Sequence, residues 1–375
     1  MDDIQMNNSL SQGIKGIKYD ASKTKEFDKS LEELIASRRA NIKVVGVGGS
    51  GNNTLNRMFE VGIKGAEFIA VNTDAADLLC TPADKKILIG KELTNGLGAG
   101  ADPAVGEAAA KEQEQELKEA LQGADLVFIC CGMGGGTGTG AAPVVASVSK
   151  KINALTIAVV TLPFKAEGRR RMNAALNGVE KLKNTVDTLI TVPNEKLMAI
   201  APGLPLPIAL KIADDVLTNA VKGITELITK PGLINVDFAD VKRIMSNGGV
   251  ALIGTGESDA KDKKLETVVE KVLNNPLIDV DVSTARGMLI DVSGGPSLTL
   301  EEANKLVDLI GQKLPEDINI IWGAHIFPDL KNTVKVLAII TGVTSKQISG
   351  KSIAEDQQLK EKQEVEDELG ITFLS

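Results

Sequence analysis

A glycine-rich run, Gly132–Gly140 (GMGGGTGTG), constrains this chain most strongly. The apolar segment Leu126–Cys131 precedes it, and Ala141–Ser149 follows it with Pro143 near the start. This order predicts a buried strand, a glycine loop and then a helix. Such a loop can point several backbone N–H groups in one direction at a helix N-terminus, which makes a phosphate site. The lysine of GxxxxGK[ST] is missing, so backbone N–H groups, the helix dipole and a metal would hold the anion.

A second glycine-rich run, Gly46–Gly51 (GVGGSG), follows the apolar segment that starts at Ile42 and precedes a predicted helix over Asn52–Val61. It matches GxGxxG between a strand and a helix, the fingerprint of a Rossmann dinucleotide-binding unit. Asp74, after the next predicted strand (Glu67–Asn72), would then bind the ribose. Taken alone, this pattern favours an NAD-dependent oxidoreductase, but it leaves GGGTGTG without a role.

Predicted strands and helices alternate from Ile42 to Pro193, and each glycine-rich run follows a strand. A third run, Asn95–Pro103 (NGLGAGADP), precedes a charged helix predicted over 104–121. The pattern predicts an α/β fold with a doubly wound, mostly parallel sheet that binds its ligand at the carboxyl edge. Two phosphate-type loops at one edge suit a nucleoside triphosphate better than one loop does.

A long amphipathic segment, Ile208–Lys230, predicts a central helix that links two domains. The apolar positions of this helix are Ile212, Val216, Ala220, Ile224 and Leu227. Beyond it, the pattern predicts a second, smaller α+β domain with a mixed sheet. Its last two strands, Ile318–Ile326 and Val334–Thr341, are joined by a short link and are therefore predicted to form a hairpin.

The chain is thus divided into five predicted parts. They are an N-terminal extension (1–40), a nucleotide-binding domain (41–207), the central helix (208–230), an acid loop with the α+β domain (231–343), and a charged linker and tail (344–375).

The composition excludes several classes of function. A net charge of −8 and 3% aromatic residues argue against nucleic-acid binding. The single histidine, His325, stands in an apolar context (WGAHIF), which argues against histidine triads and metal sites. Three cysteines suggest a reducing compartment. No apolar run approaches the length of a membrane span, so we expect no direct membrane insertion.

The run GGGTGTG, together with the other loops, resembles the signature of the FtsZ family of tubulin-like GTPases, in its archaeal type. The resemblance extends from about Ile42 to Val343. It implies binding of GTP or GDP with Mg²⁺, GTP hydrolysis, and head-to-tail self-assembly into filaments of the cell-division ring. It also implies a cytoplasmic protein located at the mid-cell division site.

The resemblance assigns the nucleotide contacts to five groups of residues. The loop under the base and phosphates comprises Gly49, Ser50, Gly51, Asn52 and Asn53, with Ser50 where glycine or alanine is usual. The backbone of Ala99, Gly100 and Ala101 would close over the γ-phosphate. The signature loop contributes Gly134, Gly135, Gly136, Thr137, Gly138 and Thr139, and Glu167 and Arg171 would meet the ribose and base region. The family more often has asparagine where this chain has Asp102, so that residue is expected to cap a helix.

Asp214, near the start of the central helix, is the fifth group. A carboxylate can accept hydrogen bonds from both N1–H and the N2 amino group of guanine, a pair that adenine does not offer. The resemblance supports Asp214 as the guanine reader, whereas the sequence by itself predicts a surface acid.

Asp237 and Asp240, with Asn235 nearby, form an acid loop at the start of a predicted helix. The residues alone leave helix capping by Asp237 open. The resemblance implies that the three residues are catalytic and complete the active site of the next subunit, where the acids polarise water and help to place the metal. No side chain is predicted to ligate the metal directly. A nucleotide edge and an acid loop at opposite ends give an open head-to-tail filament.

The polar tail ends in LGITFLS, which predicts a docking peptide for membrane-tethering or division adaptor proteins. It lacks the proline of the usual bacterial motif. Besides the oxidoreductase, a GTP-binding scaffold with little hydrolysis stays open as an alternative.

Overall fold

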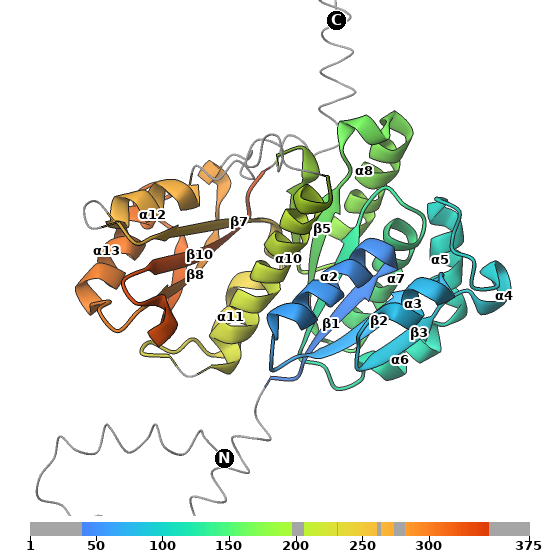
Figure 1. Cartoon of the computed structure of the whole chain (residues 1–375), viewed down its shortest axis with the longest axis horizontal. Helices are drawn as coiled ribbons and strands as arrows, with labels where there is room; N and C mark the ends of the chain where they lie inside the picture. The colour runs from blue at the N-terminus through green and yellow to red at the C-terminus, as the bar shows by residue number, and fades with distance from the viewer. Residues whose placement is uncertain (1–39, 197–205, 231, 261–263, 274–281, 345–375) are drawn as a thin grey trace, which may run out of the picture. The chain divides into compact units, whose positions relative to one another are not determined.

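A computed structural model of the protein describes residues 40–196, 206–230, 232–260, 264–273 and 282–344. The predicted N-terminal extension and the tail beyond Thr344 lie outside the described residues. Within them, one sheet of 10 strands has the order β3-β2-β1-β4-β5-β6-β7-β10-β8-β9 (Figure 1).

The first part of the sheet is entirely parallel. Its strands are β1 (Ile42–Val47), β2 (Glu67–Asn72), β3 (Lys85–Leu88), β4 (Leu126–Gly132), β5 (Leu155–Leu162) and β6 (Thr188–Pro193). The order 3-2-1-4-5-6 is that of a doubly wound sheet, whose ligand crevice opens where the winding reverses, between β1 and β4. β1 and β5 are buried along their whole length because helices cover both faces. The predicted fold class is confirmed.

The helices of this part are α2 (Gly48–Val61), α3 (Ala75–Cys80), α4 (Lys91–Thr94), α5 (Pro103–Glu112), α6 (Glu114–Leu121), α7 (Thr137–Lys151) and α8 (Arg169–Lys183), with a short turn η3 (Lys165–Glu167). α2 begins at Gly48, earlier than the predicted Asn52, because the glycine loop itself forms the first helical turn. The single helix predicted over 104–121 is broken at Gln113, whose side chain accepts a hydrogen bond from the backbone N–H of Gly90.

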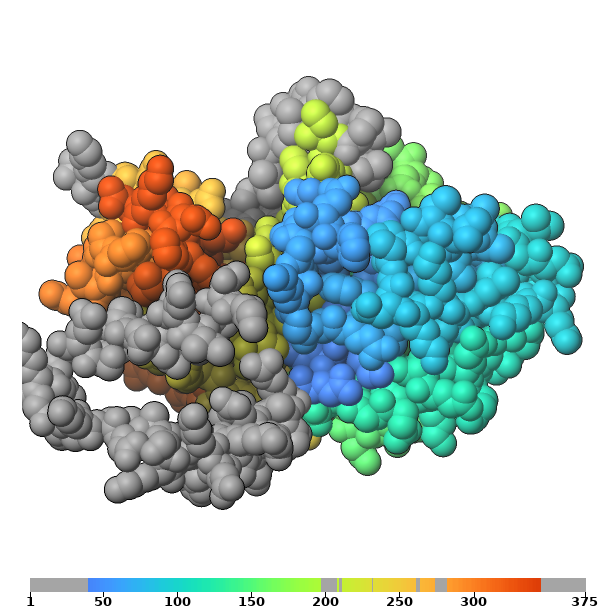
Figure 2. Space-filling model, turned by 60° about the horizontal axis from the view of Figure 1, so that its bottom comes forward, coloured from blue at the N-terminus to red at the C-terminus, as the bar shows by residue number. Residues whose placement is uncertain are grey.

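The two faces of the sheet are covered by different helices. Side chains of α2, of the long helix α10 (Leu206–Thr229) and of α11 (Phe238–Met245) pack on one face, as Leu55, Leu217 and Met245 show. Helices α5 to α8 pack on the other face. Figure 2 shows α10, in yellow-green, between the N-terminal half in blue and cyan and the C-terminal half in orange.

The buried stripe of α10 differs from the predicted one. Ala220, Ile224 and Leu227 are buried as predicted, but Ala213 and Leu217 take the places of Ile212 and Val216, which are half-buried. The predicted spacing was right for the second half of the helix and one position off in the first half.

The C-terminal part continues the same sheet. Its strands are β7 (Gly249–Ser258), β8 (Gly287–Gly294), β9 (Asn319–Ile326) and β10 (Val334–Thr341). Its helices are α12 (Lys264–Leu273) and α13 (Leu300–Gly311), with short turns η4 (Val282–Thr284) and η5 (Pro328–Leu330). β7 pairs with β6 in parallel, β10 is antiparallel to β7 and β8, and β9 is parallel to β8, so the predicted mixed sheet is confirmed.

The predicted hairpin of the last two strands is wrong, because β8 lies between β9 and β10. β10 is buried at nearly every residue, whereas β9 is only half-buried. The more apolar strand therefore takes the central position, and the strand with exposed residues takes the edge.

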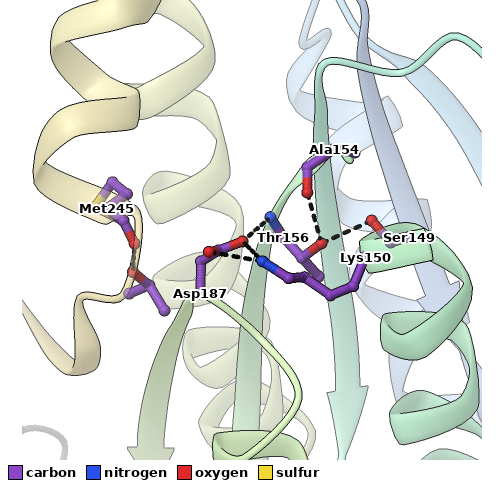
Figure 3. A network of polar contacts seen from close by, with 7 residues as sticks. Ser149, Lys150, Ala154, Thr156, Asp187 and Met245 are labelled. Atoms are coloured by element: carbon purple, nitrogen blue, oxygen red, sulfur yellow. Dashed lines mark hydrogen bonds and ion pairs between the residues drawn. The ribbon is translucent and has the colours of Figure 1, made fainter. Parts of the chain in front are cut away.

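A network of hydrogen bonds and an ion pair connects the N-terminal ends of β5 and β6, at the sheet edge opposite the glycine loops (Figure 3). Lys150, near the end of α7, donates to both carboxylate oxygens of buried Asp187 at 2.8 Å, and the Thr156 backbone N–H donates to Oδ2 at 2.9 Å. The hydroxyl of Thr188 donates to the Met245 carbonyl at the end of α11. Helices from both faces are thereby fixed to β5 and β6. Over the described residues, no helix has both the length and the apolarity to cross a membrane.

Candidate functional site

A pocket of about 560 Å³ opens at the carboxyl edge of β1, β4 and β5. The sequence-predicted residues that line it are Gly49, Ser50, Asn53, Gly135, Gly136, Thr137, Gly138, Glu167, Arg171 and Asp214. They come from the loops after these strands and from α10, so the fold brings together residues that lie far apart in sequence.

The first glycine loop turns from β1 into α2 at close range to β4. Gly48 has φ +72°, and a Cβ on it would lie 3.0 Å from the backbone nitrogen of Gly138 in the signature loop. A Cβ on Gly51 would overlap the carbonyl oxygen of Cys130 on β4. Glycine is required here because the two loops and the strand approach one another backbone to backbone.

The signature loop turns from β4 into α7. Gly134 has φ +96°, and its N–H donates to the hydroxyl of Thr139 at 2.8 Å, so Thr139 holds the loop from inside and is itself buried. A Cβ on Gly135 would have no neighbour within 4 Å, because this residue faces the open pocket. α7 starts at Thr137, and its N-terminus therefore points at the pocket.

The third loop supports the signature loop from the side. Ala99 is buried, and a Cβ on Gly136 would lie 2.8 Å from the Ala99 Cβ. Gly100 and Ala101 are exposed, and Asp102 caps α5 by accepting from the Ala104 N–H at 2.8 Å, as predicted. Ala99, Gly100 and Ala101 do not line the pocket, and their contact with a γ-phosphate stays a prediction.

Four further predicted residues lie beside the pocket rather than in its lining: Gly51, Asn52, Gly134 and Thr139. The buried Asn52 side chain donates to Asp77 Oδ2 at 3.0 Å, which fixes α2 against α3. These residues shape the loops that form the pocket.

Glu167 and Arg171 form an ion pair at 2.9 Å on one wall of the pocket. Glu167 also accepts from the Phe164 N–H at 2.8 Å, which closes the turn after β5. The pair holds a half-exposed arginine at the rim.

Asp214 projects into the pocket from the first part of α10. Its Oδ1 lies 3.0 Å from the hydroxyl of Thr54 on α2. Burial raises the pKa of Asp214 to about 6, against the effect of the Thr54 hydrogen bond. A partly desolvated carboxylate with only one such partner is an acceptor for a ligand that brings N–H donors.

Asp74, which the dinucleotide-binding interpretation would place on a ribose, does not line the pocket. Its Oδ1 accepts from the N–H groups of Ala76 and Asp77 at 2.9 and 3.1 Å, so it is the N-cap of α3. In the oxidoreductase interpretation, Asp74 is therefore not available to bind the ribose.

The acid loop follows the other end of α10, whose last residue, Thr229, lies about 22 Å along the helix axis from Asp214. Asp237 caps α11 by accepting from the Asp240 N–H at 2.8 Å, and Asn235 Oδ1 accepts from the Gly232 N–H at 2.7 Å. Asp240 is half-exposed and lies 3.8 Å from Arg243. None of the three acid-loop residues lines the pocket of its own chain, so their catalytic role stays a prediction.

Sequence reasoning missed pocket residues that carry no glycine signal. Asn194 follows β6 and lines the pocket, and its buried Oδ1 has no hydrogen-bond partner among the described residues. Phe164 and Pro163 line it after β5. Asn194 could have been found from its position, since it follows a strand that ends at the ligand edge.

Across the described residues, no group of three or more histidine, cysteine, aspartate or glutamate side chains is placed to hold a metal ion. A Mg²⁺ ion bound in this pocket would therefore take most of its ligands from phosphate oxygens and water.

Comparisons with known proteins identify the architecture. The Tubulin/FtsZ family GTPase domain matches residues 41–202, and the FtsZ family C-terminal domain matches residues 249–344. The cell division protein FtsZ 1 of Methanocaldococcus jannaschii is 55% identical over 341 residues, which cover 91% of this chain and 93% of that protein. The FtsZ of Methanothermobacter thermautotrophicus is 50% identical over 371 residues, 98% of this chain and 97% of the relative.

Solved structures give the same result. An FtsZ dimer of M. jannaschii has a TM-score of 0.80 and 58% identity, covering 84% of this chain and 92% of that chain. A protofilament of CetZ2 from Haloferax volcanii has a TM-score of 0.71 at 20% identity, covering 86% and 99%, which shows the shared fold alone. With both family domains in order and at least half of the aligned residues identical to these relatives, the chain belongs to the FtsZ family of cell-division proteins.

Proposed function

We propose that this protein binds GTP with Mg²⁺, assembles head to tail into filaments, and hydrolyses GTP where the acid loop of one subunit meets the nucleotide of the next. The observation that carries the proposal is the pocket in which two glycine loops and the Asp214 carboxylate face the same space.

The triphosphate would lie against the backbone of Gly135–Gly138 at the start of α7, where N–H groups and the helix dipole neutralise negative charge. The base would lie toward Asp214, which accepts from guanine N1–H and N2 amino groups. Glu167 and Arg171 would hold the ribose side. Bound Mg²⁺ supplies charge neutralisation on the phosphates.

Self-assembly would supply the acids that act on water, which the pocket lacks among its described lining residues. Among the pocket-lining residues, the acids are Glu167, already paired with Arg171, and Asp214, which we assign to the base. Asp237 and Asp240 follow the end of α10 that lies about 22 Å along the helix axis from Asp214, so they would reach a nucleotide only on a neighbouring subunit. Such a heterologous contact repeats into an open filament. A solved M. jannaschii relative is a dimer, which supports self-association.

The cellular role proposed is that of the division ring: a cytoplasmic protein at mid-cell, tethered to the membrane by adaptor proteins that bind the C-terminal tail. The FtsZ names of the relatives support this role.

The test is Asp240→Ala, measured for GTP binding, sedimentable polymer and GTP turnover. Turnover should fall by at least tenfold while GTP binding stays within twofold of wild type, as expected for loss of a group that positions water. Asp308→Ala, which removes an exposed acid on α13, is the matched control and should change none of the three. Loss of GTP binding in Asp240→Ala would contradict the role given to the acid loop.

A second variant distinguishes the helix-capping role of Asp237 from a catalytic role of its carboxylate charge. Asp237→Ser keeps a side-chain acceptor for the Asp240 N–H and so keeps the N-cap of α11. If the carboxylate acts on water, Asp237→Ser lowers turnover although the protein stays as stable as wild type. Full turnover in this variant would restrict Asp237 to capping.

A further inference from the structure

The side chain of His325 lies in the C-terminal part of the molecule, far from the pocket, and the mechanism above does not use it. It is 4% exposed on β9, next to a cavity of about 290 Å³ between α10 and the C-terminal strands. Its Nδ1 lies 2.8 Å from Asp291 Oδ1 on β8, and its Nε2 lies 3.3 Å from the backbone carbonyl oxygen of Lys230. Both ring nitrogens therefore face acceptors.

Two acceptors can be satisfied together only by the imidazolium, because a neutral imidazole carries one N–H. The Lys230 carbonyl stands just beyond the last residue of α10, where helix carbonyls lack partners and a positive charge is favoured. Burial by itself lowers the pKa of His325, but the hydrogen bond and charge of Asp291 outweigh burial, so the pKa lies above its ordinary value of 6.5.

The other charged groups around the ring belong to α10 and to the cavity. Lys230 Nζ pairs with Glu226 at 2.7 Å and lies over the Phe327 ring, and the charge of Glu226 also favours the imidazolium. Lys222, Asp329 and Lys335 line the adjacent cavity. Asp291 Oδ2 is held by the Ser293 hydroxyl at 3.0 Å, which keeps Oδ1 directed at the ring.

The segment that leads from α10 to the acid loop is bound by His325 and its neighbour. A Cβ on Gly232 would lie 3.0 Å from the His325 ring. The Leu233 N–H donates to the Ala324 carbonyl at 2.8 Å, and the Ala324 N–H donates to the Ile234 carbonyl at 3.1 Å. Ala324, through its backbone hydrogen bonds, and His325, through its ring, thus contact the chain immediately before Asn235 and Asp237.

We propose that protonated His325 is a positioning residue for GTP hydrolysis: by bridging Asp291 and the Lys230 carbonyl, it holds the acid loop in the geometry that acts on the neighbouring subunit's nucleotide. The proposal rests on the proposed function, and it adds a pH dependence. The bridge is complete below the pKa of His325 and is lost as pH rises through it, so turnover falls on the alkaline side while GTP binding at the distant pocket does not.

The test uses the fact that the sequence contains one histidine, so its NMR signals need no assignment. In histidine-labelled full-length protein, the ring signals should titrate with a midpoint above 6.5, and GTP turnover per polymerised subunit should fall with the same midpoint. In His325→Gln, turnover should be about threefold to tenfold lower at pH 6.5, the loss expected from one hydrogen bond, and that pH step should vanish.

Asp291→Asn should move both midpoints to lower pH, whereas Asp329→Asn, an exposed acid at the same cavity, should leave them in place. Equal pH profiles in wild type and His325→Gln, or a midpoint below 6.5, would overturn the proposal.

A separate measurement, amide hydrogen exchange, tests the positioning role of His325 without GTP. Amide hydrogen exchange at Leu233 should be faster in His325→Gln than in wild type at pH 6.5, and equal exchange would refute positioning. If wild type hydrolyses no GTP at any concentration, the proposed function fails, and the exchange result still decides whether His325 holds the loop.

Discussion

Replacing Asp214 by asparagine should make the nucleotide-free protein more stable and weaken its binding of GTP. Asparagine has nearly the same shape and keeps an acceptor for the Thr54 hydroxyl, which lies 3.0 Å from Asp214 Oδ1. The substitution removes a charge that is partly desolvated and that forms no ion pair with any residue the structure describes.

The magnitude follows from the pKa. Burial raises the pKa of Asp214 from 3.8 to about 6, which means that the ionised side chain carries about 3 kcal/mol of unfavourable free energy at neutral pH. Burial of the new asparagine amide offsets part of this stabilisation, so we expect Asp214→Asn to raise the free energy of unfolding by about 1–3 kcal/mol at pH 7.5. The gain should shrink as pH falls below 6 and should be well below about 1 kcal/mol at pH 4, where the folded carboxyl is protonated and the unfolded one is only partly ionised.

For the ligand, the charge-assisted hydrogen bonds to guanine N1–H and N2 would be lost, at about 1.5–3 kcal/mol each. GTP should bind at least tenfold more weakly, and the preference for GTP over ATP should fall by a similar factor. Thermal unfolding from pH 4 to 8 and titration with both nucleotides measure the two effects. A variant that is less stable than wild type at pH 7.5, or that keeps full selectivity for GTP, would refute the reasoning.

Three further outcomes follow from the same structure. Wild-type GTP affinity should fall as pH falls through about 6, because protonated Asp214 no longer accepts two hydrogen bonds, and Asp214→Asn should show no such step in a binding titration. Gly140→Ala should lower the free energy of unfolding by about 1–3 kcal/mol, because the new Cβ would overlap the backbone of Pro103. Gly135→Ala should keep wild-type stability and weaken GTP binding, and equal stabilities of the two variants would contradict the close packing at Gly140. Asp187→Ala should cost about 2–4 kcal/mol in denaturant unfolding, because it leaves the buried Thr156 N–H without its acceptor and removes the partner of Lys150, which is itself exposed. Glu114→Ala, from an exposed pair with Lys151, should cost less than about 1 kcal/mol, and similar losses would count against the role of the buried Asp187 carboxylate.

The parallel half of the fold was predictable because its strands are buried on both faces and appear as unbroken apolar runs between glycine loops. The mixed half was harder. Neighbours in sequence suggested a hairpin of β9 and β10, but the burial of β10 places it between β7 and β8. Short connections favour adjacent pairing only where the strands do not compete for a central position.

The pocket was predictable where glycine marks it and less so elsewhere. Gly135–Gly138 and Ser50 line it as expected, whereas Asn194 and Phe164 carry no composition signal and are recruited by the strand ends. Asp214 reads as an ordinary surface acid until α10 is placed against α2. Asp74 shows the opposite case, since the rival dinucleotide-binding interpretation would make it a ribose ligand, whereas the structure makes it a helix cap.

The central claim is that the active site forms only between subunits, and the most direct test is GTP turnover against protein concentration with GTP and Mg²⁺ saturating. We predict a threshold followed by a linear rise, because Asp237 and Asp240 follow the end of α10 that lies about 22 Å along the helix axis from Asp214 and do not line the pocket of their own chain. Turnover proportional to protein from the lowest concentration would show a self-contained site and contradict the role of the acid loop between subunits.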